Sequence, residues 1–462
     1  MSDIIAIDPH SKDHAIRSSL QTVPLGQRLL LLTYLLLTRL LPTSLILFLV
    51  RRASRKNPEE DFDRARERVA QNLPERPAGK LYWLNSIGPG DSTANQALLS
   101  HILERDPVAT VLVTTRTVSA QGIFSRWKDD PRVIRQLAPH DGLKIARNFL
   151  SHWRPSVAVF CERDLWPNML TELRRRRIPS AVVNGQLDGR LLEDFGKLQE
   201  LGRWFLSHID FIHFITDASA GLAETIMRPD TLKVLGKNLK LDCAPLPEKP
   251  DLFEQLMGAW GNNQIFTAAS VATGEFRIVL DAFRQAHSIN PDLRLILVPR
   301  WKAQSDDFLS ASREFGFDAP RRSQDILPND RCPVFIADSY GELGTWYGAS
   351  YAAFIGDTFN EGSGHNAYEA VLKGIPIVAG GIGRLFRDDF ENLVDAGIGL
   401  ITPDAEALRD AILDLTSRPL DRDVEAFLSN QGMAARVTDT LMRLRVQYAD
   451  GCRGHRTTTT RT

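Results

Sequence analysis

Residues 352–380, AAFIGDTFNEGSGHNAYEAVLKGIPIVAG, combine the signals that decide the fold of this chain. A short apolar run comes first, at Ala352–Ile355, and the glycine-rich loop Gly362–Gly364 follows it. An amphipathic stretch then ends at Gly374, and a second apolar run starts at Pro376. A strand, a glycine-rich loop, a helix and a second strand in this order predict a βαβ unit, the building block of a parallel sheet.

The same alternation of short apolar runs with amphipathic stretches extends over most of the chain. In the first half we predict strands at Lys80–Leu84, Thr110–Thr114, Ser156–Phe160, Ser180–Val183, Phe211–Ile215 and Lys233–Leu235. In the second half we predict them at Ile265–Ala268, Arg294–Val298, Val334–Ile336, Ala352–Ile355, Pro376–Ala379 and Gly399–Ile401. Strands that alternate with helices form a parallel sheet covered on both faces, so the fold class is α/β.

The chain of 462 residues is long enough for two or three domains. Residues 241–252, LDCAPLPEKPDL, contain three prolines and are typical of a hinge. We therefore predict one Rossmann-like domain at 79–240 and a second at 253–450. The tail at 451–462, GCRGHRTTTTRT, is of low complexity, and we expect it to be disordered.

The most apolar segment is 29–50, LLLLTYLLLTRLLPTSLILFLV, which as a helix is about 33 Å long and long enough for a bilayer core. Arg39 opposes insertion by about 2.5–3.5 kcal/mol, and Pro42 kinks a helix. The leucines outweigh the arginine. We predict a membrane-anchor helix that spans the bilayer or lies in its interface, between an extension at 1–28 and a charged linker or helix at 51–78. A buried core helix is the alternative.

The overall charge is balanced, because 56 Lys and Arg face 57 Asp and Glu. This balance disfavours a nucleic-acid partner. Basic residues nevertheless gather directly after the apolar segment, at Arg51, Arg52, Arg55 and Lys56. By the positive-inside rule they place the downstream domains in the cytoplasm. The four cysteines have no CxxC spacing, which disfavours a zinc site and fits a reducing compartment.

Candidate ligand-binding residues of the second domain follow predicted strands, where α/β sheets bind ligands. The glycine-rich loop suits an anion because its backbone N–H groups can approach a phosphate. Asn366 and Glu369 share one helix face, where the carboxylate can accept both hydroxyls of a ribose. Arg300 can bind phosphate, and Glu342 can bind a ligand beside local amides. An ordinary capped turn at Asn366 and a capping box at Glu342 are the alternatives.

Candidate residues of the first domain follow the strands at Lys80–Leu84 and Ser156–Phe160. Asp91 lies in NSIGPGD near a helix start, where it is either a general base or an N-cap. The motif CERDLWPN places Glu162 and Asp164 at the same rim. Lys240 precedes the hinge and can face an interdomain cleft. The sequence has no HExxH, GxSxG or Walker A motif, which disfavours a protease, a lipase or an NTPase.

Several short motifs of this chain occur in one order. They are TTRT at Thr114–Thr117, APHD at Ala138–Asp141, HWRP at His152–Pro155, LWPN at Leu165–Asn168, NLKLD at Asn238–Asp242, GE at Gly274–Glu275, LVPR at Leu297–Arg300, GELG at Gly341–Gly344 and GHN…E at Gly364–Glu369. Over nearly all of residues 64–445 the sequence resembles the Kdo transferases (3-deoxy-D-manno-octulosonic acid transferases, glycosyltransferase family 30). LWPN, GELG and GHN are specific as a set, although each is weak alone.

The resemblance implies a GT-B fold, with two facing Rossmann-like domains and an N-terminal anchor. It implies an inverting, metal-independent transfer of Kdo from CMP-Kdo to a lipid A-type acceptor in lipopolysaccharide synthesis. The implied location is the cytoplasmic side of the inner membrane. The resemblance implies no cofactor, only the donor substrate. The implied site consists of Asp91 as catalytic base, Lys240, Arg300, Glu342, Gly364, Asn366 and Glu369 at the donor, and Glu162, Asp164 and Asn168 on the acceptor side.

This chain departs from the family pattern at several of these motifs. HAASVGE is replaced by NSIGPGD, so the catalytic Glu has become Asp91, and a base misplaced by about 1 Å can cost about a hundredfold in rate. Arg116 replaces a glycine of the threonine-rich loop, and Asp164 replaces the second Glu of ELWPN. These changes indicate a divergent member. A UDP-sugar-dependent GT-B transferase and a non-catalytic, membrane-anchored scaffold are the two alternatives.

Overall fold

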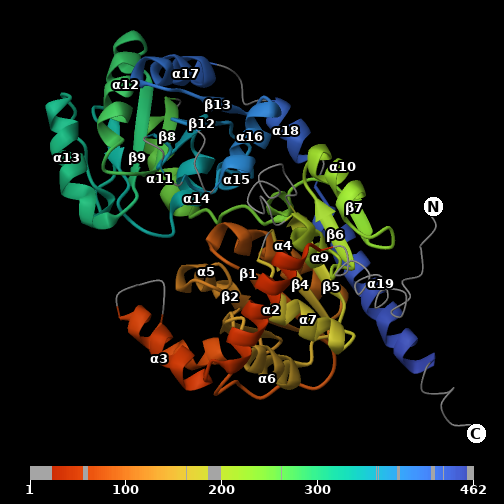
Figure 1. The fold of residues 1–462 in the computed structure, drawn as a ribbon. Coiled ribbons are helices and arrows are strands. Elements are labelled where there is room, and N and C mark those ends of the chain that lie inside the picture. The colour runs from red at the N-terminus through yellow and green to blue at the C-terminus, as the bar shows by residue number, and fades with distance from the viewer. Residues whose placement is uncertain are drawn as a thin grey trace, which may run out of the picture. The chain divides into compact units, whose positions relative to one another are not determined.

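A computed structural model of the chain describes residues 23–55, 61–162, 164–185, 199–261, 263–359, 362, 364–381, 386–417, 422–429 and 431–454. The chain divides into two compact α/β units, shown in Figure 1. The first unit combines Met1–Cys243 with Gly432–Thr462, and the second is Ala244–Gln431. The predicted α/β class with two parallel-sheet domains is confirmed.

The first unit is built on a seven-stranded parallel sheet in the order β3-β2-β1-β4-β5-β6-β7. Its strands are β1 (Leu81–Ser86), β2 (Thr110–Thr115), β3 (Val133–Leu137), β4 (Val157–Cys161), β5 (Ser180–Gly185), β6 (Phe211–Phe214) and β7 (Leu232–Leu235). Every residue of β1, β2, β4 and β5 is buried, as expected for inner parallel strands that helices cover on both faces. The strand order reverses between β1 and β4, which is where sheets of this kind bind ligands.

The helices of the first unit precede, connect or follow these strands. They are α2 (Leu25–Leu40), α3 (Thr43–Ser54), η1 (Asp63–Val69), α4 (Pro89–Arg105), α5 (Val118–Gly122), η2 (Ser125–Trp127), α6 (Leu143–Trp153), α7 (Pro167–Arg175), α9 (Gln199–Leu206), α10 (Asp217–Ile226), η4 (Leu239–Asp242) and α19 (Met433–Gly454). Helices α4 and α7 begin at Pro89 and Pro167, because a proline in the first turn has no N–H whose hydrogen bond would be lost.

The second unit repeats the design with six parallel strands in the order β10-β9-β8-β11-β12-β13. Its strands are β8 (Gln264–Val271), β9 (Leu293–Pro299), β10 (Val334–Ile336), β11 (Ala352–Ile355), β12 (Ile377–Ala379) and β13 (Gly399–Ile401). Its helices are α11 (Pro250–Trp260), α12 (Phe276–Ile289), η5 (Lys302–Gln304), α13 (Ser305–Glu314), η6 (Arg322–Gln324), α14 (Leu343–Gly348), α15 (Tyr368–Val371), α16 (Arg387–Asp395), α17 (Ala405–Ser417) and α18 (Arg422–Leu428). Here the strand order reverses between β8 and β11.

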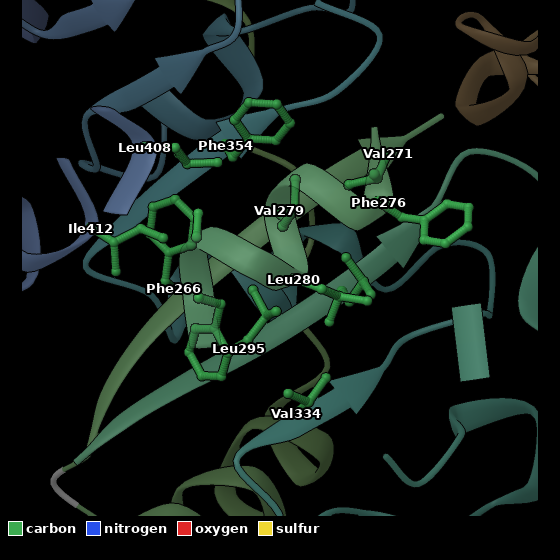
Figure 2. Close-up of a cluster of buried hydrophobic side chains, with 14 of the residues drawn as sticks. Phe266, Val271, Phe276, Val279, Leu280, Leu295, Val334, Phe354, Leu408 and Ile412 are labelled. Atoms are coloured by element: carbon green, nitrogen blue, oxygen red, sulfur yellow. The ribbon is translucent and has the colours of Figure 1, made fainter. Parts of the chain in front are cut away.

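Successive residues of the strands in the second unit pack on opposite faces of the sheet. Phe266 belongs to the core cluster that includes α12 and α17, shown in Figure 2, whereas Ile265 belongs to the cluster that includes α11. Leu295 and Ile296 of β9 divide in the same way. This two-residue period places apolar side chains against both helical layers and fixes the register of the sheet.

The N-terminal apolar segment is not one helix. Helices α2 and α3 meet at a break around Pro42 with a bend of 91°, so the prediction of a single helix across residues 29–50 is wrong. Within the described residues, no individual helix has the length and apolar character to cross a membrane. The two helices of this bent pair reach that length and apolar character only when they are taken together. The membrane anchor therefore stays a prediction. Both helices carry exposed leucines, while Leu31 and Val50 are buried against the first unit.

The last helix departs from the predicted domain boundary at 253–450. Helix α19 belongs to the first unit, where it contacts α4. The carboxylate of Asp242 accepts hydrogen bonds from the backbone N–H groups of Gly432 (2.6 Å) and Ala434 at its start. The hydroxyl of Tyr448 donates to Asp210 at 2.6 Å. The helix continues to Gly454, into the predicted tail, and residues 455–462 lie outside the described residues.

Candidate active site

The strand-order reversal of the first unit brings two predicted acids together. Asp91 lies in the first turn of α4, just after β1, and Glu162 directly follows β4. The backbone N–H of Ile87 donates to Asp91 Oδ2 at 3.3 Å. Asp91 and Glu162 are also within hydrogen-bonding reach of each other. Because β1 and β4 are neighbours, their carboxyl ends place both side chains at one edge of the sheet.

Lys240 is the basic partner of this acid pair. Its Nζ lies 3.8 Å from Oε1 of Glu162, and its side chain is almost fully buried. Asn238 holds the turn, because its Oδ1 accepts from the backbone N–H of Lys240 at 3.0 Å and from Nδ2 of Asn184 at 2.7 Å. The structure thus places Lys240 in the first unit, beside Glu162. Its predicted contact with the donor stays a prediction.

The surroundings of Asp91 suit a general base. Burial raises the pKa of Asp91, and the charge of Lys240 then lowers it in part. Hydrogen bonds from the backbone N–H groups of Gly88 and Ile87 and with Glu162 act in the same direction as Lys240. A carboxylate with a raised pKa accepts a proton more readily than an exposed one, so this residue is suited to remove a proton from a hydroxyl.

Asp164 is held within the protein on several sides. Its oxygens accept from Nδ2 of Asn85 at 2.7 Å and from Nε1 of Trp166 at 2.6 Å. The guanidinium of Arg116 lies 3.8 Å from Asp164 Oδ1 and stacks over the ring of Trp166, with Cζ 4.9 Å from its centroid. Asp164 and Arg116 line a cavity of about 40 Å³ that also includes Arg68. This cavity was not predicted from the sequence.

Asn168 packs against α2. Its Nδ2 donates to the hydroxyl of Thr38 at 3.0 Å and to the carbonyl of Asp141 at 2.7 Å. The carboxylate of Asp141 caps α7 by accepting from the backbone N–H groups of Asn168 (3.0 Å) and Met169 (2.9 Å). The hydroxyl of Tyr34 on α2 also donates to Asp141, at 2.9 Å. The observed role of Asn168 is therefore to fasten α2, and its predicted place on the acceptor side remains untested.

In the second unit, one carboxylate organises the loop after β11. Glu275, which follows β8, accepts from the backbone N–H groups of Thr358 (2.6 Å) and Phe359 (2.7 Å) through Oε1. Its Oε2 accepts from those of Asp357 (2.5 Å) and Ala272 (3.1 Å). Glu275 is almost fully buried. The sequence showed it only as part of a GE motif, and its role became visible when β8 and β11 were found side by side.

Glycines let the same loop fold tightly on itself. Gly364 has φ +73°, a conformation that L side chains rarely adopt, and its N–H donates to the carbonyl of Asp357 at 2.7 Å. A Cβ atom on Gly362 would lie 2.1 Å from the same carbonyl oxygen. The glycine-rich loop predicted from the sequence is therefore required by the backbone geometry.

Asn366 and Glu369 lie together, as their spacing predicts. Nδ2 of Asn366 donates to Oε1 of Glu369 at 3.4 Å, and its Oδ1 accepts from the backbone N–H of Tyr368 at the start of α15. Burial raises the pKa of Glu369 to about 7, against a smaller lowering by Asn366. Helix α15 has only four residues, so its dipole is small and the predicted helix N-terminus contributes little to anion binding.

Arg300 lies close to the same loop. Its positive charge contributes, after burial, to lowering the pKa of His365 to about 4, which places the guanidinium near the imidazole. Arg300 also stacks over Trp301, with Cζ 4.8 Å from the ring centroid. Nε2 of His365 is buried without a hydrogen-bond partner in the part of the chain described. His365 lies in the GHN motif, but the sequence alone did not single it out.

Glu342 has a different environment. It accepts from Nζ of Lys249 at 2.9 Å, from Nε of Arg322 at 3.1 Å, and from the hydroxyl of Ser339. Burial alone would raise the pKa of Glu342, but hydrogen bonds from Ser339, Lys249 and Arg322 lower it below the ordinary value. A Cβ on Gly344 would lie 2.3 Å from the carbonyl of Pro247, so the GELG motif also allows close backbone packing. These contacts favour a structural role for Glu342.

The structure thus forms two groups of candidate residues, each at the point where its sheet reverses strand order. The group in the first unit is Asp91, Glu162 and Lys240, and the group in the second is Arg300, Gly364, His365, Asn366 and Glu369. This fold and these polar groups define the class as a two-domain, Rossmann-like protein of GT-B type.

Comparisons with known proteins show which proteins this chain is similar to. A family model described as 3-deoxy-D-manno-octulosonic-acid transferase (kdotransferase) matches residues 63–243. The 3-deoxy-D-manno-octulosonic acid transferase of Haemophilus influenzae (strain ATCC 51907 / DSM 11121 / KW20 / Rd) is 27% identical over 369 residues, which cover 78% of this chain and 86% of the relative. That of Bordetella pertussis is 27% identical over 396 residues, which cover 84% and 92%.

A solved structure with a similar fold is the UDP-GlcNAc 2-epimerase from Neisseria meningitidis bound to UDP-GlcNAc. It is 11% identical, covers 78% of this chain and 99% of its own, and has a TM-score of 0.52. This likeness concerns the fold alone. The family model and the two relatives together show that the chain is similar to the 3-deoxy-D-manno-octulosonic acid transferases.

Proposed function

We propose that the chain is an inverting glycosyltransferase that moves Kdo from CMP-Kdo to a lipid A-type acceptor in lipopolysaccharide synthesis. The observation that carries the proposal is the position of Asp91, a partly buried carboxylate with a raised pKa beside Glu162 and Lys240 at the strand-order reversal. Similarity to these relatives supports the choice of sugar, because they are named for the transfer of this sugar and match over most of their length.

In the proposed reaction, an acceptor hydroxyl attacks the anomeric carbon of the Kdo residue. Asp91 removes the hydroxyl proton as the new carbon–oxygen bond forms. The bond between the anomeric carbon and the phosphate oxygen breaks, and its electron pair leaves with CMP. Lys240 favours the ionised form of Asp91, because its positive charge offsets some of the burial effect on the pKa.

The second group of residues is proposed to hold the donor nucleotide. Glu369 in its ionised form can accept hydrogen bonds from both ribose hydroxyls, and Asn366 orients it. Arg300 can stabilise the phosphate as its negative charge grows. Nε2 of His365 offers a further polar contact from the same loop.

The location and the metal requirement are part of the same proposal. The exposed leucines of α2 and α3, followed by Arg51 and Arg52, support attachment to the cytoplasmic face of the inner membrane. We further propose that the transfer needs no metal ion and no cofactor, because Arg300 offers charge stabilisation at the phosphate.

A direct transfer assay tests the proposal. Purified protein is incubated with CMP-Kdo and a lipid A precursor, with and without EDTA, and the product is detected by mass spectrometry. The wild type should add Kdo, Asp91→Asn should lose at least a hundredfold in rate, and Asp129→Asn, at an exposed position, should match the wild type. Transfer from UDP-sugars in place of CMP-Kdo would instead favour the UDP-sugar alternative. Absence of both transfer and nucleotide binding would favour the scaffold.

A further inference from the structure

A groove of about 430 Å³ lies in the corner between α2 and α3. The bend of 91° at Pro42 creates this corner. The walls that the two helices contribute are mainly apolar and include Leu41, Ile46, Leu49 and Val50. Figure 1 shows the two helices, in red and orange, running in different directions from their junction.

The groove is held in shape by contacts of both helices with the rest of the first unit. Tyr34 on α2 donates its hydroxyl proton to Asp141, and Thr38 accepts from Asn168. On α3, Ile46 packs against the core cluster of the sheet, and Val50 is buried. Because each helix is fastened separately, the corner does not depend on contacts across the groove itself.

The far wall of the groove leads to a polar cavity. His140, Asp141 and Trp166 line both the groove and the cavity of about 40 Å³ described above, so the two are adjacent. The cavity contains Arg68 and Arg116. Burial and then the charges of these two arginines lower the pKa of His140 to about 4, so both guanidinium groups lie near this imidazole. Asp141 and Asp164 are the acids that face the same cavity.

Arg116 also joins the cavity to the loop of the candidate base. Its backbone N–H donates to the carbonyls of Ser86 and Ile87, both at 3.1 Å, and the N–H of Ile87 donates to Asp91. The side chain of Arg116 is 38% exposed, so an anionic group from solvent can approach it. An apolar groove, a pair of arginines and the candidate base therefore follow one another along the first unit.

We propose that this groove binds one acyl chain of an anionic glycolipid acceptor, with an acidic group of its head at Arg116. This inference rests on the proposed function, which it deepens. A glycolipid fits the order of the surfaces, because it carries an apolar chain, an anionic head and sugar hydroxyls in one molecule. A polar peptide segment is disfavoured, since the helix walls are mainly apolar and the charged side chains gather at one end.

Photo-crosslinking tests this assignment without relying on catalysis. The probe is a phosphorylated glucosamine disaccharide whose acyl chains end in a diazirine, presented in detergent micelles to the full chain. Leu41→Asp places a charge inside the groove, and Leu45→Asp places the same charge outside it. Leu41 and Leu45 are each 42% exposed, but only Leu41 lines the groove, so Leu45→Asp is a control of matched exposure.

The expected label in the wild type and in Leu45→Asp lies on peptides from α2, α3 and residues 138–142. Leu41→Asp should reduce this label at least fivefold, with both variants retaining the circular dichroism spectrum of the wild type. Equal labelling of both variants, or label that avoids these peptides, would overturn the assignment. If the wild type shows groove labelling but no Kdo transfer, the proposed function alone is refuted. Failure of the groove assignment and failure of the proposed function are therefore distinguishable.

Discussion

Oε1 of Glu275 accepts a hydrogen bond from the backbone N–H of Thr358 at 2.6 Å, across the boundary between β8 and β11. The same carboxylate binds the N–H groups of Asp357 and Phe359. Three consecutive peptide groups of the loop after β11 are thus fixed by one buried side chain from the segment between β8 and α12. The loop has its shape before a ligand binds, which reduces the entropic cost of binding.

We expect Glu275→Gln to weaken CMP binding more than tenfold. An amide nitrogen would face backbone N–H donors, so the hydrogen bonds to one oxygen are lost and a buried donor is left unpaired. The free energy of unfolding should fall by about 2–4 kcal/mol. Calorimetric titration with CMP and urea unfolding measure the two effects. Glu314→Gln, on the exposed end of α13, is the control and should change neither. Unaltered CMP affinity in Glu275→Gln would show that the loop needs no such support.

The rate of transfer should depend on pH through Asp91. The base must be ionised, and burial raises its pKa, so activity should disappear as the pH falls through a value above the ordinary range for an aspartate. Lys240→Met removes a charge that lowers this pKa. The acidic limb of the rate profile should therefore move to higher pH. Lys233→Met, where the lysine pairs with Glu224, is the matched control. If the acidic limb of the rate profile does not move in Lys240→Met, Lys240 does not influence the pKa of the base.

CMP affinity should depend on pH through Glu369. Its pKa of about 7 means that the carboxyl group is increasingly protonated below pH 7. A protonated carboxyl accepts fewer hydrogen bonds from ribose, so the dissociation constant should rise by up to about tenfold per pH unit below 7. Glu369→Gln should bind more weakly at pH 8 and lose the pH dependence. Deoxycytidine monophosphate, which lacks one ribose hydroxyl, should show a weaker dependence. A wild-type affinity that is constant from pH 5.5 to 8 would contradict the assignment.

Glu342 should contribute more to stability than to ligand binding. Glu342→Gln removes the charge that pairs with Lys249 and Arg322, and we expect the free energy of unfolding at pH 7 to fall by about 2 kcal/mol. The pKa of Glu342 is lowered in the folded state, so its contribution is present above the unfolded value and is lost as the pH falls through the folded one. Urea unfolding should therefore show the wild type and the variant converging below about pH 4. If Glu342→Gln lost much of its CMP affinity but kept the stability of the wild type, a direct contact between Glu342 and the donor would be supported instead.

The strands that the sequence missed or shortened have a physical explanation. The edge strand β3, VIRQL, was not predicted because Arg135 and Gln136 interrupt its apolar run. Tertiary contacts compensate for the polar side chain of Gln136, since its Oε1 accepts from Nε1 of Trp153 at 3.1 Å. The inner strands were predicted because both of their faces are buried, which requires continuous apolar runs.

The candidate site also contains some residues that the sequence singled out and others that it did not. Asn366 and Glu369 were singled out from their spacing, because they are close to each other along the chain. Asp91 was singled out from its motif and its place after a strand, but its partners Glu162 and Lys240 are distant in the sequence. Glu275 and His365 were not singled out, since a buried carboxylate that binds a loop 83 residues away leaves no local pattern. The bend at Pro42 was predicted as a kink, but the groove needs the contacts of Tyr34 with Asp141, which no local pattern announces.

The sequence by itself determined the α/β class, the two domains, the family motifs and the glycine-rich loop, because these depend on periodicity and on backbone conformations that only certain residues adopt. Only the tertiary structure decided that α19 returns to the first unit, that Lys240 lies beside Glu162, and that Arg116 connects the polar cavity to the loop of Asp91. Each of these joins residues that are far apart in the chain. Such contacts are selected by the packing of the whole unit, and no short stretch of sequence contains that information.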